Sequence, residues 1–143
     1  MSTRALLLNL LWLVLGGLAA AIAWGVAAVI MAITIIGIPW ARAAVTIAIY
    51  TLLPFGQKAV ARDQYVGRKD IGTSVLGEIG NVIWLILAGW WLALIHLLAA
   101  VVFAITIIGL PFAWAHIKLG KLALWPIGKM IVLAGDVPPI DRR

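Results

Sequence analysis

The sequence predicts an all-α integral membrane fold of two tandem helical hairpins, with about four membrane segments. Three observations carry this prediction: high hydrophobicity, two long apolar blocks, and a repeat of constant spacing. The chain of 143 residues is 65% hydrophobic and only 11% charged, whereas soluble domains average about 25% charged residues. Its mean hydropathy is +1.15. This leaves too little polar surface to coat a water-soluble globule of this size.

The repeat consists of three motifs that each recur 72 residues later. Asn9-Leu-Leu-Trp12 returns as Asn81-Val-Ile-Trp84, the Ile-Thr-Ile-Ile-Gly-x-Pro segment 33–39 returns as 105–111, and Pro54-Phe-Gly56 returns as Pro126-Ile-Gly128. Aligned without a gap, 9–60 and 81–132 agree at 22 of 52 positions. A constant offset over separate motifs indicates that one membrane-embedded unit was duplicated.

Charged residues mark the boundaries of the two units. We expect a first membrane repeat over 5–60, a polar linker over 61–78, a second repeat over 79–132, and a disordered tail over 133–143. The tail lacks an apolar period and contains two prolines, a composition typical of an extended or disordered end.

Each repeat is predicted to be a long helical arm, a break and a short helical arm. Lipid offers no hydrogen-bond partners to the backbone, so an apolar segment inside a membrane is helical. A straight helix of about 50 residues is roughly 75 Å long, far more than the hydrocarbon core of about 30 Å. The Gly-x-Pro of each repeat provides the break, because proline lacks the helix donor. The long arms cover about 5–35 and 79–107, and the short arms about 39–53 and 111–125.

The arms differ in what they can do in a bilayer. A long arm of about 45 Å must tilt strongly or bend, whereas a short arm of about 22 Å barely spans. The second short arm carries Trp114, Lys118, Lys121 and Trp125 on one helical face, which suits the membrane–water interface. A short crossing and a re-entrant or interfacial helix both remain open.

The charge distribution predicts an orientation. If each repeat crosses an even number of times, both termini and the central loop share one side and gather most of the eleven Lys and Arg residues there. The positive-inside rule makes that side cytoplasmic. The repeats would then be parallel, around a pseudo-two-fold axis along the membrane normal.

Composition excludes several functions. The chain has no cysteine, which removes thiol catalysis and thiolate metal sites. All five acidic residues fall in loops or the tail, and no catalytic triad or phosphate loop is visible. We therefore expect no enzyme activity, no cofactor and no metal. The net charge of +6 fits loops that face anionic lipid better than it fits nucleic acid.

The repeated break is the first candidate site. Broken segments at matching positions in two halves point to a transport pathway, because unwound carbonyls can coordinate ions. The alternative is a plain hairpin turn in which the threonine hydroxyl bonds the backbone one turn earlier. The candidates are Thr34, Gly37, Pro39, Thr106, Gly109 and Pro111.

Polar side chains inside the long arms form the second set. Asn9 and Asn81 are either helix–helix hydrogen-bonding groups or ligands in a pore. His96 replaces Trp24 of the first repeat. It is either a proton relay or gate, or a neutral ring packed between helices. His116 is expected at the interface.

Cationic side chains of the short arms form the third set. Arg42, Lys118 and Lys121 could extend to lipid phosphates. They could also line a pathway that favours anions.

The motifs together resemble a known family. Asn81, Trp84, Gly89, Trp91, His96, the segment 105–111, Trp125, Pro126 and Gly128 are similar to the pattern of YccF-type bacterial inner membrane proteins. That family is described by a short domain that is usually present twice. The resemblance covers roughly 5–132 and implies a multi-pass inner membrane protein, but it implies no reaction.

Two functions follow as hypotheses. Four segments of this size do not easily enclose a pathway, so we expect a homo-oligomer that acts as a small channel or transporter component. The alternative is a non-transporting accessory or scaffold protein that binds a membrane protein partner or organises lipid.

Overall fold

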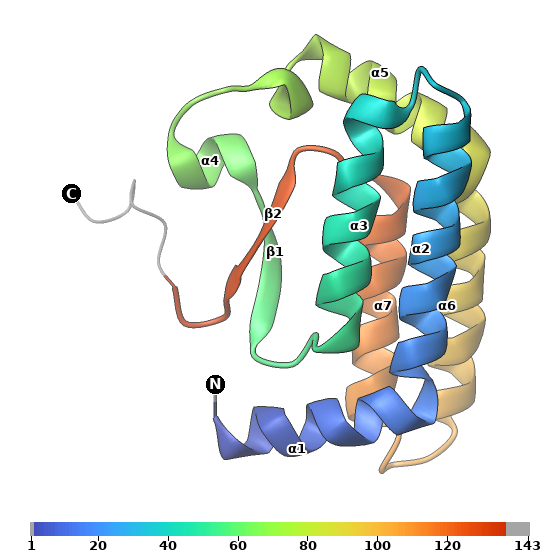
Figure 1. The fold of residues 1–143 in the computed structure, drawn as a ribbon. Coiled ribbons are helices and arrows are strands. Elements are labelled where there is room, and N and C mark those ends of the chain that lie inside the picture. The colour runs from blue at the N-terminus through green and yellow to red at the C-terminus, as the bar shows by residue number, and fades with distance from the viewer. Residues whose placement is uncertain (1, 137–143) are drawn as a thin grey trace.

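The computed structural model describes residues 2–136 (Figure 1). In chain order the elements are α1 (Thr3–Trp12), a π-helical segment η1 (Leu13–Gly17), α2 (Leu18–Ile33), α3 (Ile38–Leu52), β1 (Gln57–Ala61), α4 (Arg62–Val66), a 3-10 turn η2 (Ile71–Thr73), α5 (Val75–Trp84), a π-helical segment η3 (Leu85–Gly89), α6 (Trp90–Ala104), α7 (Leu110–Leu124) and β2 (Lys129–Leu133). Of the tail predicted to be disordered, 137–143 lies outside the described residues.

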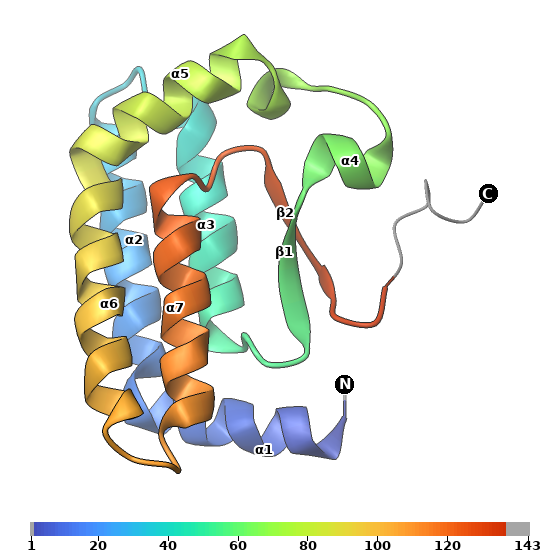
Figure 2. The ribbon, with the colours of Figure 1, turned by 180° about the vertical axis from the view of Figure 1, so that it is seen from behind.

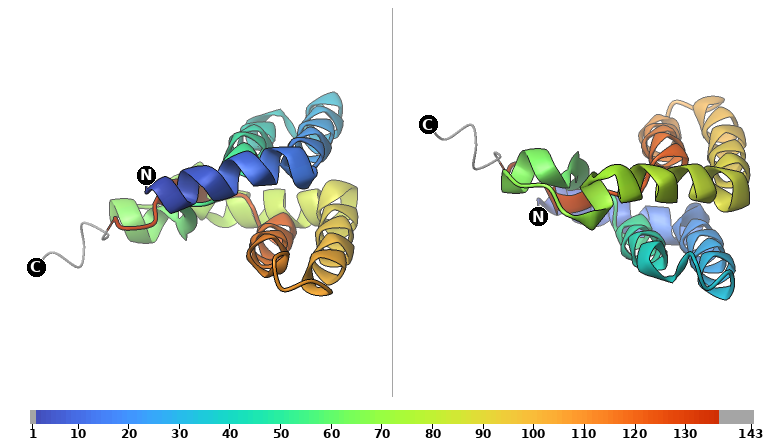
Figure 3. Two further views of the ribbon diagram at one scale, coloured as in Figure 1. Left: turned by 90° about the horizontal axis from the view of Figure 1, so that it is seen from below. Right: turned by 90° about the horizontal axis from the view of Figure 1, so that it is seen from above.

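Four helices form a bundle, and two others lie across its ends. The hairpin of α2 and α3 packs beside the hairpin of α6 and α7. Helix α1 crosses one end of the bundle and α5 crosses the other (Figure 3). The predicted fold class of two tandem helical hairpins is confirmed, and the short arms begin and end within about one residue of their expected positions.

Both long arms bend sharply, as the excess of their length over the bilayer predicted. The bend is a π-helical segment directly after the repeated tryptophan, and π segments are a common cause of kinks. In the first repeat Gly16 has φ +154°, a value that L side chains rarely adopt. A Cβ on Gly17 would collide with the ring of Trp12. The straight part of this arm, α2, has 16 residues, or about 24 Å.

A pseudo-two-fold axis relates the repeats, and it runs across the bundle helices. Two contacts join residues that are 72 apart and therefore equivalent: Trp24 hydrogen-bonds His96, and Ala59 pairs with Ile131 in the sheet. Two equivalent residues can contact each other only where the axis passes between them. The axis therefore runs through the middle of the ribbon and through the contact between α2 and α6. Helices α2 and α6 are antiparallel (Figures 1 and 2). The two hairpins are therefore antiparallel to each other along the bundle. The expectation of parallel repeats around an axis along the membrane normal then requires that the bundle helices lie near the membrane plane.

The antiparallel β-ribbon is an element that the apolar pattern of the sequence does not predict. Its strands β1 and β2 follow the Pro-x-Gly turns that end the two short arms. Gly56 and Gly128 in these turns have φ of +86° and +88°, which glycine adopts without strain. The ribbon packs beside α3 and α7, on the side of the bundle opposite α2 and α6 (Figure 2). It joins two segments that are far apart in the chain.

Aromatic rings fill the core between the hairpins. Trp24 stacks on Trp84 with ring centroids 5.6 Å apart, and Trp12 stacks on Phe112 at 6.4 Å. The largest fully buried side chains are Trp12, Trp24, Trp84, Phe112, Met31, Ile47, Leu92, Leu119, His96, Asn9, Asn81 and Thr51. The centre of the bundle is therefore packed and closed.

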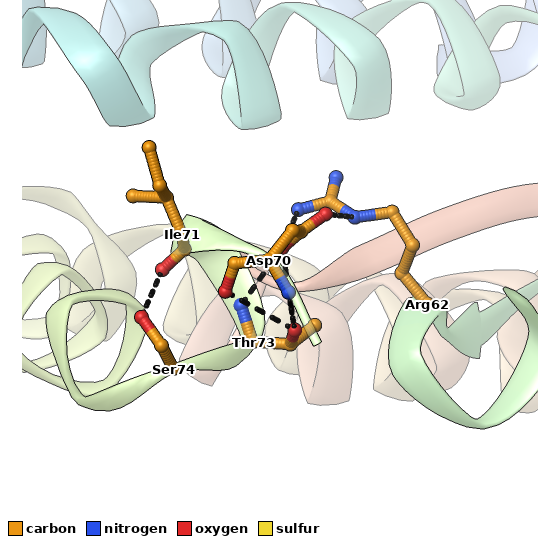
Figure 4. A network of polar contacts seen from close by, with 5 residues as sticks. All are labelled: Arg62, Asp70, Ile71, Thr73 and Ser74. Carbon is orange, nitrogen blue, oxygen red and sulfur yellow. Dashed lines mark hydrogen bonds and ion pairs between the residues drawn. The ribbon is translucent and has the colours of Figure 1, made fainter. Parts of the chain in front are cut away.

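The linker is ordered by a small polar network (Figure 4). Asp70 caps η2 by accepting from the backbone N–H of Thr73. The Arg62 guanidinium donates to Asp70 at 2.8 Å and forms an ion pair with it. This hydrogen bond holds the pKa of the Asp70 carboxyl below its usual value. The network fixes the entry into α5 against the ribbon.

The turn between α2 and α3 contains backbone strain that the equivalent turn between α6 and α7 lacks. Ile35 has φ +62°, an outlier for a β-branched residue, whereas the equivalent Ile107 has no positive φ. Substitution Ile35→Gly should therefore raise the free energy of unfolding by about 1 kcal/mol. Ile107→Gly is the matched control and should leave it unchanged or lower it. Unfolding in mixed detergent micelles measures both, and equal effects at the two sites would contradict the assignment of strain.

Candidate functional site

The repeated breaks form two separate hairpin turns. The Thr34 hydroxyl donates to the Met31 carbonyl at 2.7 Å and accepts from the Gly37 N–H at 3.1 Å. Thr106 makes the same pair of contacts with Phe103 and Gly109. A Cβ on either glycine would collide with the carbonyl of Met31 or Phe103. These contacts agree with the second interpretation of the motif, a plain hairpin turn closed by the threonine hydroxyl.

The two turns lie at opposite ends of the bundle (Figure 1). Pro39 and Pro111 occupy the first turn of α3 and α7, where a missing N–H leaves no bond unmade. The structure therefore does not bring the six candidates of the break together. The turn tips carry isoleucines that are 68–87% exposed: Ile33, Ile35, Ile36, Ile105, Ile107 and Ile108.

Asn9 lies in α1 and Asn81 in α5, the two helices that cross the ends of the bundle. Asn9 connects α1 to the end of α3, and Asn81 connects α5 to the end of α7. The Asn81 amide donates to the Ile127 carbonyl at 3.1 Å, and its oxygen accepts from the Ile127 N–H at 3.0 Å. Asn9 makes the same two bonds to Phe55 at 3.0 and 2.9 Å. Both asparagines are buried. Their amides thus satisfy backbone groups just beyond the ends of α3 and α7.

Trp12 and Trp84, the tryptophans of the repeated motif, bond to backbone carbonyls in the last turns of α3 and α7. Trp12 donates its indole N–H to the Thr51 carbonyl at 2.6 Å, and Trp84 donates to the Ala123 carbonyl at 2.7 Å. Carbonyls in the last turn of a helix have no partner within the helix. The Asn-x-x-Trp motif is therefore a pair of side-chain caps that one helix supplies to another.

A buried imidazole pair lies in the core, where the two repeats meet. Trp24 Nε1–H donates to His96 Nε2 at 3.0 Å. A neutral His96 then carries its proton on Nδ1, which lies 2.9 Å from His116 Nδ1. The proton of His116 is then on Nε2, a buried atom without a hydrogen-bond partner among residues 2–136. His116 is 3% exposed, so the expectation that it lies at the interface is wrong.

Cationic side chains of the short arms line two grooves beside the ribbon. Arg42 lines a groove of about 630 Å³ together with Arg62, Asp70 and Lys129. The Arg62–Asp70 ion pair neutralises part of that groove.

We call the second groove the lysine groove. It has a volume of about 320 Å³ and is lined by Tyr50, Lys58, Ala59, Lys118, Lys121, Leu122, Trp125 and Lys129. Sequence reasoning selected Lys118 and Lys121 but missed Lys58 and Lys129. One sequence feature could have identified these two lysines: a basic residue follows each Pro-x-Gly turn within two positions.

Exposed apolar side chains are found on most elements, including α3, α5 and α7, and they dominate α1, α2, α6 and both hairpin turns. The cations of α3 and α7 line grooves that they share with the ribbon. Arg4 and Glu78 lie near the starts of α1 and α5, which face the ribbon side (Figure 1).

By length and composition, the helical stretches Thr3–Ile33 and Val75–Ala104 are long and apolar enough to cross a membrane. Among residues 2–136, no group of three or more His, Asp or Glu side chains could hold a metal ion.

Comparison with known proteins decides the family. Residues 7–57 and 79–129 each match the inner membrane component domain of YccF. The chain belongs to the YccF family. It is 35% identical to inner membrane protein YccF of Escherichia coli K12 over 126 residues, which is 87% of this chain and 85% of that protein. The YccF protein of Shigella flexneri matches equally. No solved structure matches the chain significantly. The protein is thus a membrane-embedded YccF protein of the inner membrane.

Proposed function

We propose that this YccF protein is a non-transporting, non-catalytic accessory protein that organises lipid. In this proposal it enters the bilayer from the cytoplasmic side, its bundle helices lie near the membrane plane, and its pseudo-two-fold axis points along the membrane normal. The termini of the described chain, the linker and the ribbon then face the cytoplasm. The observation that carries the proposal is that the groove-lining cations gather beside the ribbon, whereas α2 and α6 at the opposite end of that axis expose apolar side chains.

The hairpin turns support this orientation. If the bundle helices crossed the membrane, the two turns would meet water on opposite sides, with three strongly exposed isoleucines at each tip. With the axis along the membrane normal, equivalent positions lie at equal depth, and both turns are in lipid. The second arrangement keeps all six isoleucine side chains away from water.

The charges beside the ribbon support it as well. In a crossing bundle, Lys118 would lie near the middle of the bilayer, since it occupies the central part of α7, and Lys121 would follow in the last turn. A lysine or arginine at that depth costs about 2.5–3.5 kcal/mol on translocon-based scales. The five-residue strands β1 and β2 would also expose their outer edges to hydrocarbon, where backbone groups find no partner.

The dimensions fit a partial insertion. Helices α1 and α5 have ten residues each, or about 15 Å, and the width of α2 or α6 adds about 10 Å. The inserted part is then about 25 Å deep, less than the hydrocarbon core of about 30 Å. Such a body displaces lipid mainly from the cytoplasmic side, which is a physical basis for organising lipid.

Thiol labelling tests the orientation, because the chain has no cysteine of its own. We expect Gln64→Cys to react with an impermeant maleimide in inside-out vesicles but not in intact spheroplasts. The equivalent tip variants Ile36→Cys and Ile108→Cys should stay unreactive in both and react after solubilisation in SDS. Labelling of the two tips from opposite sides would instead establish a crossing bundle and overturn the proposal.

The second candidate is the homo-oligomeric channel or transporter component. An apolar groove of about 500 Å³ between α2 and α3 favours it, because Ala21, Gly25 and Ala28 leave room there for a helix of another copy. Proteoliposomes separate the two functions. We expect ion and proton flux no higher than that of empty liposomes. Flux clearly above that of empty liposomes would favour the channel. Co-purification of a stoichiometric membrane protein partner without flux would favour the accessory role.

A further inference from the structure

Four lysines converge on the lysine groove from three elements, of which β1 is distant in sequence from α7 and β2. Lys58 comes from β1, Lys129 from β2, and Lys118 and Lys121 from successive turns of α7. The groove has no acidic lining residue. Among residues 2–136 the one ion pair is Arg62–Asp70, so these four ammonium groups have no carboxylate partner in the described chain.

This concentration of charge favours a bound anion. Three of the four lysines are only partly exposed, so solvent screens their repulsion less than it would on an open surface. Lys58 donates to the backbone carbonyl of Asp136 at 3.1 Å, a contact that does not neutralise its charge. A bound anion would offset the repulsion and supply acceptors for the ammonium groups.

The edge of the groove indicates where the anion comes from. The partly exposed Trp125 lines it beside the lysines, and the buried Tyr50 forms part of its wall. Tyrosine and tryptophan are the residues enriched at the headgroup level of membranes. Leu124, next to Trp125, is exposed and continues the apolar surface. A ligand with a charged head and an apolar tail satisfies both parts of this arrangement.

We infer that the lysine groove binds the headgroup of an anionic phospholipid. Four cations match a headgroup with two phosphates better than one with a single phosphate. The acyl chains follow the apolar surface next to Trp125. This site deepens the proposed lipid-organising function and rests on it, because it names the lipid class that the protein would recruit.

Native mass spectrometry of the full chain in mild detergent tests the site. Cardiolipin, phosphatidylglycerol and phosphatidylcholine are titrated separately. We expect a stoichiometric adduct with cardiolipin, weaker binding of phosphatidylglycerol and little of phosphatidylcholine. The variant Lys58→Gln/Lys118→Gln/Lys121→Gln should lose at least tenfold in affinity for cardiolipin. Equal binding of phosphatidylcholine by the wild type would overturn the inference.

A matched control separates the groove from overall charge. Arg4→Gln/Arg68→Gln/Lys69→Gln removes the same number of cations at exposed positions outside the groove, and its affinity should stay within twofold. Equal losses in both variants would assign the binding to net charge. Displacement of the lipid by millimolar inorganic phosphate would assign the groove to a soluble anion. Thermal melting of each variant in detergent verifies folding.

These outcomes are independent of the thiol-labelling result. Adduct formation is measured in detergent, where orientation in a bilayer plays no part. A crossing bundle with a cardiolipin adduct would overturn the proposed orientation and support the lipid site. Unreactive hairpin tips without an adduct would support the orientation and overturn the lipid site.

Discussion

Substitution Asn81→Leu should destabilise the protein by about 2–5 kcal/mol, because it leaves two buried backbone groups without partners. The side chain is 1% exposed, and both of its bonds go to Ile127. Leucine has the same number and branching of side-chain heavy atoms, so no cavity forms and the loss mainly reports the hydrogen bonds. Water is scarce beside Ile127, which is itself buried, and so the freed N–H and C=O are not rescued.

The repeat provides an internal replicate of this experiment. Asn9→Leu should cause a loss of the same order, because Asn9 makes the same bonds to Phe55. Gln64→Leu, an amide-to-leucine change at an exposed position, is the control and should change the free energy of unfolding by less than about 0.5 kcal/mol. Unfolding in dodecylmaltoside–SDS mixtures, followed by circular dichroism, measures all three. A loss below 1 kcal/mol at both asparagines would mean that the caps are dispensable.

The caps illustrate how far sequence reasoning reached. The constant offset established that Asn9 and Asn81 do the same job, and the polarity of an amide in an apolar arm indicated that each needs a partner. It could not identify that partner. Phe55 and Ile127 lie 46 residues further along the chain, and no local pattern encodes a contact of that range.

The helices, in contrast, could be predicted, because local sequence determines where they begin and end. The break at Gly37 and Gly109 and the ends of the short arms are set by local chemistry, namely a missing proline donor and a Pro-x-Gly turn. The ribbon is not local, because β1 and β2 pair across most of the chain. Its strands contain Lys58 and Lys129, two positions at which the sequence predicted no strand. For this reason sequence reasoning found only half of the lysines in the groove.

The relative direction of the repeats was also beyond the sequence. A duplication shows that two units are alike but not how they pack. The parallel arrangement followed from assuming that each repeat crosses the bilayer an even number of times, as the charge distribution suggested. Trp24 and His96 contact each other on the axis, and this contact shows that the axis runs across the helices. The charge asymmetry that motivated a shared cytoplasmic side is compatible with that axis when the bundle lies near the membrane plane.

The residue pair on the axis gives the second large effect that we expect. Substitution His96→Leu should lower the free energy of unfolding by about 2–4 kcal/mol, because it removes the acceptor of a buried indole N–H and the partner of His116. Trp24 is fully buried, so its N–H has no access to water. The measurement is the same unfolding titration in mixed micelles.

A double-mutant cycle separates this orphaned donor from simple loss of packing. Trp24→Phe removes the indole N–H, and together with His96→Leu it leaves no unpaired group at this contact. Because removal of both partners is much less costly than removal of one, the two changes should be coupled by more than about 1 kcal/mol. Additive losses would mean that the Trp24–His96 hydrogen bond contributes nothing. The imidazole would then act only as a packed ring, in the way that the tryptophan at the equivalent position of the first repeat fills its own place in the core.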